Sequence, residues 1–147
     1  MLVDDDRAVR TSLALALQSE AYEVTQAANG QEGLEQLQGG DIDLVLLDLN
    51  LPVKNGWDTF ERMTAINPLL PIVLITARPN QYKLACAAGA SALMEKPLHL
   101  PQLLQTISDL LKEPPGARLQ RIAGYQRNIP HGTRRLNEVR GRNSIAP

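Results

Sequence analysis

Several side chains that can take part in catalysis or metal binding stand directly after short apolar runs of the sequence. Each run has the composition and length of a buried strand. The residues that follow the runs are Asp4, Asp5, Asp48, Thr76 and Lys96. Taken singly, each has an ordinary explanation as a helix cap, a turn residue, a strand-end hydroxyl or a solvated cation. Together they predict a site if the fold brings the ends of these strands side by side.

The three carboxylates predict a bound cation, because a cluster of like charges is costly unless a cation balances it. The available ligands are oxygens. The two histidines, His99 and His131, stand alone in the sequence, and the single cysteine, Cys86, lies in an apolar stretch. Oxygen ligands favour a hard ion, so we expect Mg²⁺ rather than zinc or copper.

The same residues suit phosphoryl transfer. That reaction needs a nucleophilic oxygen, neutralisation of the charge on the phosphoryl oxygens, and positioned hydrogen-bond donors. In this hypothesis Asp48 is the nucleophile, while Asp4 and Asp5 hold the metal. Lys96 pairs with one phosphoryl oxygen, and the Thr76 hydroxyl donates to another.

The elements that must position these residues follow a pattern of strand and then helix, repeated five times. The expected strands are Leu2–Val3, Tyr22–Thr25, Ile42–Leu47, Pro71–Ile75 and Ser91–Glu95. The expected helices are Arg7–Glu20, Gln31–Leu37, Trp57–Ile66, Gln81–Ala88 and Leu100–Leu111. Such units predict an α/β fold with a doubly wound, five-stranded parallel sheet and helices on both faces. In these sheets the ligand site lies beyond the carboxyl ends of the strands.

With these motifs the sequence resembles the receiver domains of bacterial two-component response regulators. The segments that carry the resemblance are Leu2–Asp6 with Arg10, Leu46–Pro52 through Gly56, Ile75–Ala77, Ala88–Ala90 and Glu95–Pro97. They stand in that family's order and approximate spacing and cover about residues 1–113. The resemblance implies a flavodoxin-like (βα)5 fold with strand order 2-1-3-4-5 and a phosphorelay role in signal transduction.

The resemblance also implies residue roles. Asp48 is expected to be phosphorylated, with Mg²⁺ bound, by a histidine kinase or a histidine phosphotransfer protein. Asn50 is expected to give the metal its backbone carbonyl, and Thr76 to act in the switch that follows. The Lys96–Pro97 peptide is expected to be cis, a form that costs about 0.5–1 kcal/mol before proline. Such a module is regulatory and catalyses only its own phosphorylation and dephosphorylation, after which its contacts with a downstream protein change.

Two features depart from the family pattern. The family's switch couples the threonine or serine to an aromatic residue three positions before the lysine, and that position here is Leu93. We therefore expect a smaller rearrangement at the surface. Only Met1 to Val3 precede the acidic pair, so the first strand is shorter than the common length of about five or six residues.

The last part of the chain differs in charge and pattern. Residues 1–113 hold 8 Lys and Arg against 15 Asp and Glu, whereas residues 114–147 hold 7 against 1. Pro114 and Pro115 end the last helix, and large apolar residues then become rare. We expect a receiver domain over residues 1–113 and a basic, flexible tail over residues 114–147. A helix over Ala117–Gln126 is the alternative for the start of the tail.

Two other functions stay open. A tail that contacts DNA would make the chain a transcription regulator, although only 3% of the residues are aromatic and no recognition helix is evident. A metal-dependent phosphatase also uses aspartates at strand ends, but it needs a second acid near the nucleophile. Asn50 stands two residues after Asp48, and an amide cannot deliver a proton.

The sequence shows no signal peptide and no apolar run that approaches the roughly 18–20 residues of a membrane span. We therefore expect a cytoplasmic protein with no membrane partner, monomeric or weakly dimeric, that does not bind nucleic acid on its own.

Overall fold

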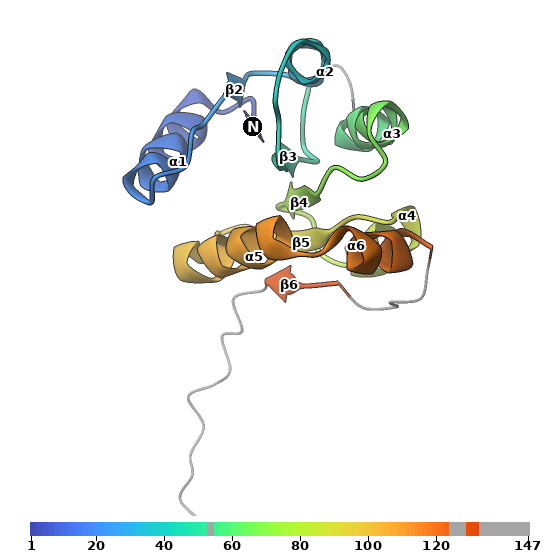
Figure 1. Cartoon of the computed structure of the whole chain (residues 1–147). Coiled ribbons are helices and arrows are strands. Elements are labelled where there is room, and N and C mark those ends of the chain that lie inside the picture. The colour runs from blue at the N-terminus through green and yellow to red at the C-terminus, as the bar shows by residue number, and fades with distance from the viewer. Residues whose placement is uncertain (53–54, 124–128, 133–147) are drawn as a thin grey trace, which may run out of the picture.

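The protein is described by a computed structural model that covers residues 1–52, 55–123 and 129–132. Six parallel strands form one sheet in the order β2-β1-β3-β4-β5-β6 (Figure 1). The strands are β1 Leu2–Val3, β2 Gln26–Ala27, β3 Val45–Asp48, β4 Ile72–Thr76, β5 Ala92–Glu95 and β6 His131–Gly132. The predicted order of the first five strands is confirmed. The sixth strand was not predicted.

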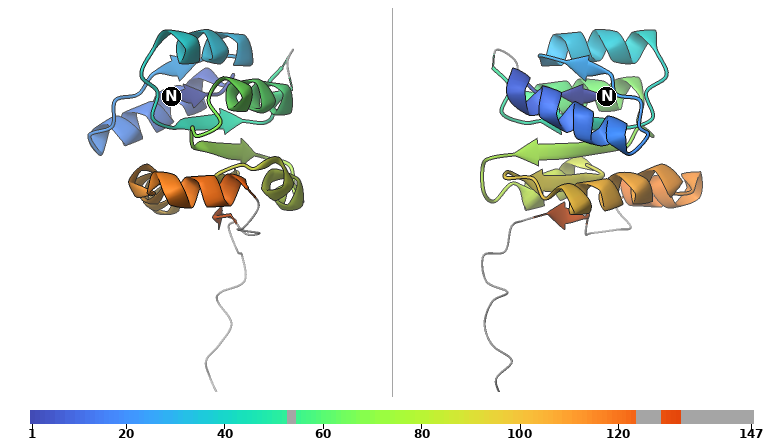
Figure 2. Two further views of the ribbon diagram at one scale, coloured as in Figure 1. Left: turned by 45° about the vertical axis from the view of Figure 1, so that its right-hand side comes forward. Right: turned by 90° about the vertical axis from the view of Figure 1, so that its left-hand side faces the viewer.

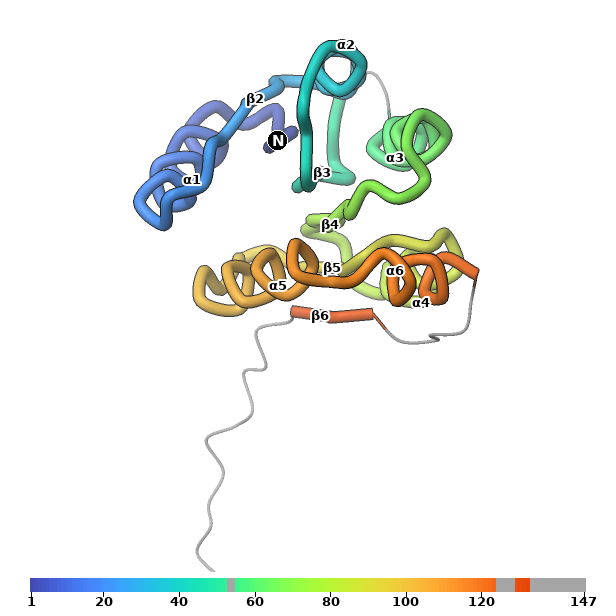
Figure 3. The backbone as a smooth tube through the Cα atoms, viewed as in Figure 1, coloured from blue at the N-terminus to red at the C-terminus, as the bar shows by residue number. Residues whose placement is uncertain are grey.

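Helices cover both faces of the sheet, as the doubly wound prediction required (Figures 1 and 3). The helices are α1 Arg7–Ser19, α2 Gly30–Gly39, α3 Gly56–Ile66, α4 Tyr82–Ala88, α5 Leu100–Lys112 and α6 Pro115–Ile122. Helices α1 and α5 share one apolar core, and α2, α3 and α4 share the other. Because both faces are covered, every residue of β3 and β4 is buried.

Short polar side chains determine where three of the helices begin. The Asp6 carboxylate accepts the backbone N–H groups of Ala8 and Val9, which begins α1. Asn29 caps α2 in the same manner, and Asn55 caps α3. These caps satisfy N–H groups that have no partner within their helix. None of the helices in the described part of the chain has the length and apolar composition that a membrane crossing requires.

Two predicted strands are shorter or placed later than expected. Strand β2 lies at Gln26–Ala27 and not at Tyr22–Thr25, and β3 begins at Val45 rather than at Ile42. The central strand β1 begins at Leu2, which pairs with Gln26 on one side and Leu46 on the other. Strand β1 therefore offers no partner to the chain upstream of Thr25, whereas Val45 is still paired with Ile72 of β4 on its other side.

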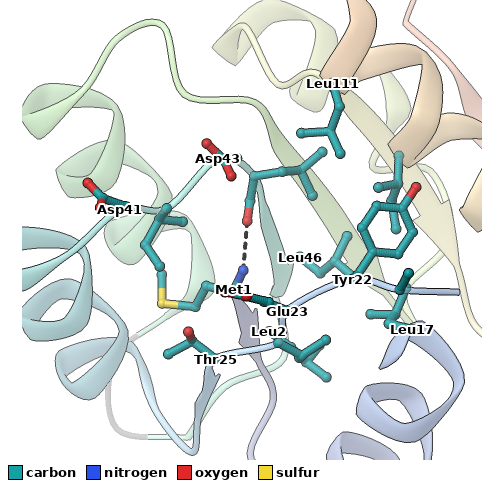
Figure 4. A pocket seen from close by; sticks show the side chains of 15 residues that line it. Met1, Leu2, Leu17, Tyr22, Glu23, Thr25, Asp41, Asp43, Leu46 and Leu111 are labelled. Atoms are coloured by element: carbon teal, nitrogen blue, oxygen red, sulfur yellow. Dashed lines mark hydrogen bonds between the residues drawn. The ribbon is translucent and has the colours of Figure 1, made fainter. Parts of the chain in front are cut away.

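A cavity of about 330 Å³ lies beside Met1 and Leu2, at the start of β1 (Figure 4). Leu17, Tyr22, Leu46 and Leu111 line its apolar part, and Glu23, Asp41 and Asp43 lie toward its edge. The Met1 ammonium stands in this space and donates a 2.8 Å hydrogen bond to the Leu44 carbonyl oxygen. Burial lowers the pKa of that ammonium, although the charge of Asp43 opposes the effect. The cavity is at the end of β1 opposite the acidic pair.

The chain beyond α5 packs against the preceding part of the fold at two places. Helix α6 begins at Pro115, two residues before the helix proposed as an alternative, and the end of that alternative lies outside the described residues. Strand β6 then pairs with β5 at the edge of the sheet (Figure 2). Residues 124–128 and 133–147 lie outside the described part, so the boundary at residue 113 and the flexible basic tail stay predictions.

Candidate functional site

The carboxyl ends of four neighbouring strands bring the predicted residues together. Asp48 and Thr76 are the last residues of β3 and β4, while Asp4 and Lys96 directly follow β1 and β5. Asp4, Asp48 and Thr76 are buried, and Asp5 is exposed beside them. One carboxylate oxygen from each of Asp4, Asp5 and Asp48 lies within 4.8 Å of the other two. The parallel strands thus produce the cluster that their sequence order predicted.

Lys96 joins two of these carboxylates. Its Nζ lies 2.7 Å from Asp48 Oδ2 and 3.2 Å from Asp4 Oδ2. Burial lowers the pKa of Lys96, but the hydrogen bonds and charges of Asp48 and Asp4 together outweigh this effect and raise it. The ammonium is therefore charged at neutral pH and offsets part of the negative charge of the cluster.

Asp4 is held rigidly and is costly to ionise. Its Oδ1 accepts the Asp6 backbone N–H at 2.8 Å, and its backbone carbonyl accepts a hydrogen bond from the Arg10 guanidinium. Burial raises the pKa of Asp4 and the nearby Asp48 charge adds to this, while the Asp6 N–H and Lys96 act in the opposite direction. A second cation beside Asp4 would relieve the cost of its ionised form.

Asp48 is fixed through both of its oxygens. Oδ1 accepts the Asn50 backbone N–H at 2.7 Å, and Oδ2 accepts from Lys96. The Asn50 side chain also lies in the site, since its Oδ1 accepts the Thr76 hydroxyl at 3.4 Å. The same hydroxyl accepts the Arg78 backbone N–H at 2.9 Å. Thr76 is thus held by one bond of ordinary length to Arg78 and one long bond to Asn50, in the loop that follows Asp48.

Gly56, which the sequence analysis named only as part of the resemblance, positions this loop. A Cβ at Gly56 would lie 2.4 Å from the Leu49 Cα and 2.7 Å from the Asp48 carbonyl oxygen. Both are backbone atoms that cannot move aside cheaply. Only glycine lets the start of α3 approach the loop this closely. The Asn55-Gly56 pair in the sequence signals a turn but not a close contact.

The expected switch residues lie on one face of the sheet but do not pair directly. The strand register joins Thr76 to Glu95 and Leu93 to Leu74. Leu93 is therefore a diagonal neighbour of Thr76, and it is completely buried. Beyond β5, the Lys96–Pro97 peptide is cis.

The donor set fits a divalent cation that prefers oxygen. Within the described residues, no histidine or cysteine belongs to the acidic cluster. Two of the three carboxylates are buried and share one lysine, so the cluster keeps an excess of negative charge. Carboxylates with a backbone carbonyl nearby are the ligands that Mg²⁺ commonly takes together with water.

Comparison with known proteins gives one consistent family. A family model described as "Response regulator receiver domain" matches residues 1–108. The transcriptional regulatory protein GlrR of Escherichia coli is 33% identical over 115 residues, which are 77% of this chain and 26% of GlrR. The response regulator MprA of Mycolicibacterium vanbaalenii is 34% identical over 114 residues, which are 76% of this chain and 49% of MprA. The chain thus spans only a quarter to a half of these relatives.

Solved structures agree with the sequence relatives. A CheY-like response regulator receiver domain protein from Methanospirillum hungatei superposes with a TM-score of 0.70 at 32% identity, covering 75% of this chain and 90% of that one. The response regulator TrrA from Thermotoga maritima, in complex with Mg²⁺-BeF, gives a TM-score of 0.69 at 30% identity, covering 74% and 95%. The solved structures and the family model therefore indicate the same family.

Proposed function

Because this chain belongs to the family of response-regulator receiver domains, which act in phosphorelay signalling, we propose that Asp48 is the residue that accepts the phosphoryl group. The donor is a histidine kinase or a histidine phosphotransfer protein, and the product changes the contacts of the chain with a downstream protein. One observation carries this assignment. The buried Asp48 carboxylate is held by Lys96 at 2.7 Å, beside two further carboxylates.

Asp4, Asp5 and Asp48, with the backbone carbonyl of Asn50, are the proposed ligands of Mg²⁺. The raised pKa of Asp4 and the oxygen-only donor set support this proposal. The complex of TrrA with Mg²⁺-BeF supports it by analogy. When bound, the metal neutralises charge that develops on the phosphoryl oxygens.

Three residues of the chain have different roles in the transfer of the phosphoryl group. An Asp48 oxygen forms a bond to phosphorus while the bond from phosphorus to the donor breaks, and the leaving group keeps that electron pair and takes a proton. Lys96 is already beside Asp48 and moves its charge to a phosphoryl oxygen. The Thr76 hydroxyl exchanges its 3.4 Å bond to Asn50 for one to the phosphoryl group. Only the chain itself is modified, so the module is regulatory.

A transcription regulator is the second candidate, because the matched relatives GlrR and MprA are named as regulators and are two to four times longer than the matched region. The arginines of the tail that would contact DNA lie mostly outside the described residues. DNA retardation by the full chain that weakens steeply with salt would favour this function. A phosphatase is not favoured, since Asn50 stands where a second acid would be needed.

We expect the reaction to take place in the cytoplasm, where kinases draw on ATP. Incubation of the full chain with a small phosphodonor and Mg²⁺, followed by intact mass measurement, tests the proposal. We expect a gain of one phosphoryl group in the wild type and in Asp41→Asn, whose carboxylate is exposed and far from the site. Asp48→Asn has no anionic oxygen to attack phosphorus and should gain nothing. A stable phosphoryl group on Asp48→Asn would place the acceptor elsewhere.

A further inference from the structure

The loop between β1 and α1 carries two of the proposed metal ligands, and an arginine of α1 binds its backbone. The Arg10 Nη1 donates to the Asp4 backbone carbonyl at 2.6 Å. Asp4 is buried, and Arg10 is half-buried. Among the described residues, no other group donates to this carbonyl. Because a buried carbonyl needs a partner, Arg10 takes the place of the strand ladder that ends at β1.

The exposed ligand Asp5 depends on this backbone for its position. Within the part of the chain that the structure describes, no group forms a hydrogen bond or an ion pair with the Asp5 carboxylate. The Asp4 carboxylate, by contrast, accepts from the Asp6 N–H and from Lys96. The Asp4 carbonyl and the Asp5 N–H belong to one planar peptide unit. A bond that fixes this carbonyl therefore fixes the unit from which Asp5 extends.

The start of α1 holds Arg10 itself in place. The Asp6 carboxylate accepts the N–H groups of Ala8 and Val9, and the Asp6 carbonyl accepts the Arg10 N–H at 2.9 Å. The side chain of Arg10 then reaches back to the end of β1. The loop of three aspartates is thus tied to α1 by its backbone and by one guanidinium.

We propose that Arg10 is a positioning residue for the divalent cation, because its bond to the Asp4 carbonyl holds the Asp5 carboxylate in place. This inference rests on the proposed Mg²⁺ site and adds to it a residue that does not touch the ion. The positive charge of Arg10 alone would repel a cation. Loss of the charge and loss of the position therefore change Mg²⁺ affinity in opposite directions, which makes the two roles separable.

The test measures Mg²⁺ affinity in the full chain through the fluorescence of Trp57, at the start of α3 beside the Asp48 loop. Arg10→Met keeps an aliphatic stem but removes the guanidinium. We expect it to bind Mg²⁺ about tenfold or more weakly than the wild type, as when a partner that orients a metal ligand is lost. The matched control is Arg7→Met, which removes an exposed positive charge from the same helix. It should bind Mg²⁺ at least as tightly as the wild type.

A double-mutant cycle shows whether Arg10 acts through Asp5. In an Asp5→Ala background, Arg10→Met should weaken Mg²⁺ binding by less than about twofold, because the ligand that it positions is absent. A second readout needs no metal. The Asp6 amide donates to Asp4 Oδ1 at 2.8 Å, and it should exchange at least about tenfold faster in Arg10→Met than in the wild type or in Arg7→Met.

An unchanged or higher Mg²⁺ affinity in folded Arg10→Met would overturn the inference alone, provided that the wild type binds Mg²⁺. Equal losses in the wild-type and Asp5→Ala backgrounds, or unchanged exchange of the Asp6 amide, would also overturn it. A wild type that binds no Mg²⁺ would remove the proposed metal site together with this inference. Urea unfolding reports whether Arg10→Met is folded. If it is not, Arg10→Gln replaces it, because glutamine is neutral and shorter than arginine.

Discussion

At the scale of single residues, the acidic site lowers the stability of the fold when no metal is bound. Burial raises the pKa of Asp4, so its ionised form is less favourable in the folded chain than in the unfolded chain. The folded state then binds the proton more readily, and stability is lost as the pH rises from the ordinary carboxyl range through the raised pKa. At neutral pH without metal, Asp4 therefore destabilises the fold.

This cost gives a prediction for Asp4→Asn. At neutral pH and without Mg²⁺, the variant should have a higher free energy of unfolding than the wild type, and the difference should shrink as acid protonates Asp4. Added Mg²⁺ should stabilise the wild type by about 2.7 kcal/mol when its concentration is 100 times its dissociation constant, and the variant by much less. Urea unfolding at several pH values provides the measurement. Equal stabilisation of both proteins by Mg²⁺ would remove Asp4 from the ligand set.

Asp5 gives a second prediction at this scale. Its carboxylate is exposed, so Asp5→Ala should leave the fold intact while it weakens Mg²⁺ binding about tenfold or more. Trp57 stands in the first turn of α3, which Gly56 holds against the Asp48 loop, so its fluorescence should follow the titration. Exposed Asp41→Asn should titrate as the wild type does. An unchanged affinity in Asp5→Ala would contradict the assignment.

At the scale of elements, two arginines fasten α6 to the rest of the fold. Arg121 is buried and binds Glu113 at 2.9 Å and the Ser91 hydroxyl at 3.1 Å. Arg118 donates to the Leu69 and Leu110 carbonyls, and the second of these lies in the last turn of α5. Carbonyls at helix ends have no partner within the helix, so Arg118 satisfies one of them.

Removal of Arg121 should therefore destabilise the domain. We expect Arg121→Ala to lower the free energy of unfolding by about 1.5–3 kcal/mol, since it breaks hydrogen bonds between charged groups and leaves Ser91 without this partner. Arg7→Ala is the control, because Arg7 is exposed on α1. A thermal or urea unfolding curve distinguishes the two. Equal stability of both variants would mean that α6 is not part of the cooperative unit.

The switch gives the other prediction at this scale. Beryllofluoride with Mg²⁺ should slow amide exchange near Asp48 and Thr76, where new acceptor atoms order the loops. Leu93 is shorter than an aromatic ring and carries no polar tip, so we expect only modest changes across Tyr82–Ala88. A ligand shifts an equilibrium only by its different interaction with the two states. Large changes over α4 and α5 that persist in Leu93→Ala would show that residue 93 is not part of the switch.

At the scale of the whole molecule, the sequence predicted the strand order and the residues at the strand ends. The strand order followed from the resemblance, and the position of Asp4, Asp48, Thr76 and Lys96 followed from the rule that parallel strands place their carboxyl ends together. Contacts between segments that are distant in the sequence could not be predicted by these rules. His131 pairs with Glu95, and Arg121 is buried. Neither could be predicted from periodicity, because each is a single polar residue in a segment with few apolar residues.

The short central strand gives a prediction about the whole fold. A residue added before Met1 falls in register between Val24 and Leu44, on the side of the sheet where Leu2 packs. An isoleucine there should fill part of the cavity and raise the free energy of unfolding by about 1.5–3 kcal/mol. A serine at the same position is the control. If both extensions have the same stability in urea, the added residue does not enter the sheet.

The sixth strand also bears on how the protein behaves at high concentration. An exposed edge strand is a template for pairing between molecules, and β5 has an apolar, fully buried Leu93 directly behind that edge. Because Ile129–Gly132 covers this edge, we expect it to protect the chain against aggregation. A chain shortened to end at residue 113 would lose this cover and the ion pair of Glu113 with Arg121. Light scattering should then detect association that the longer chain does not show.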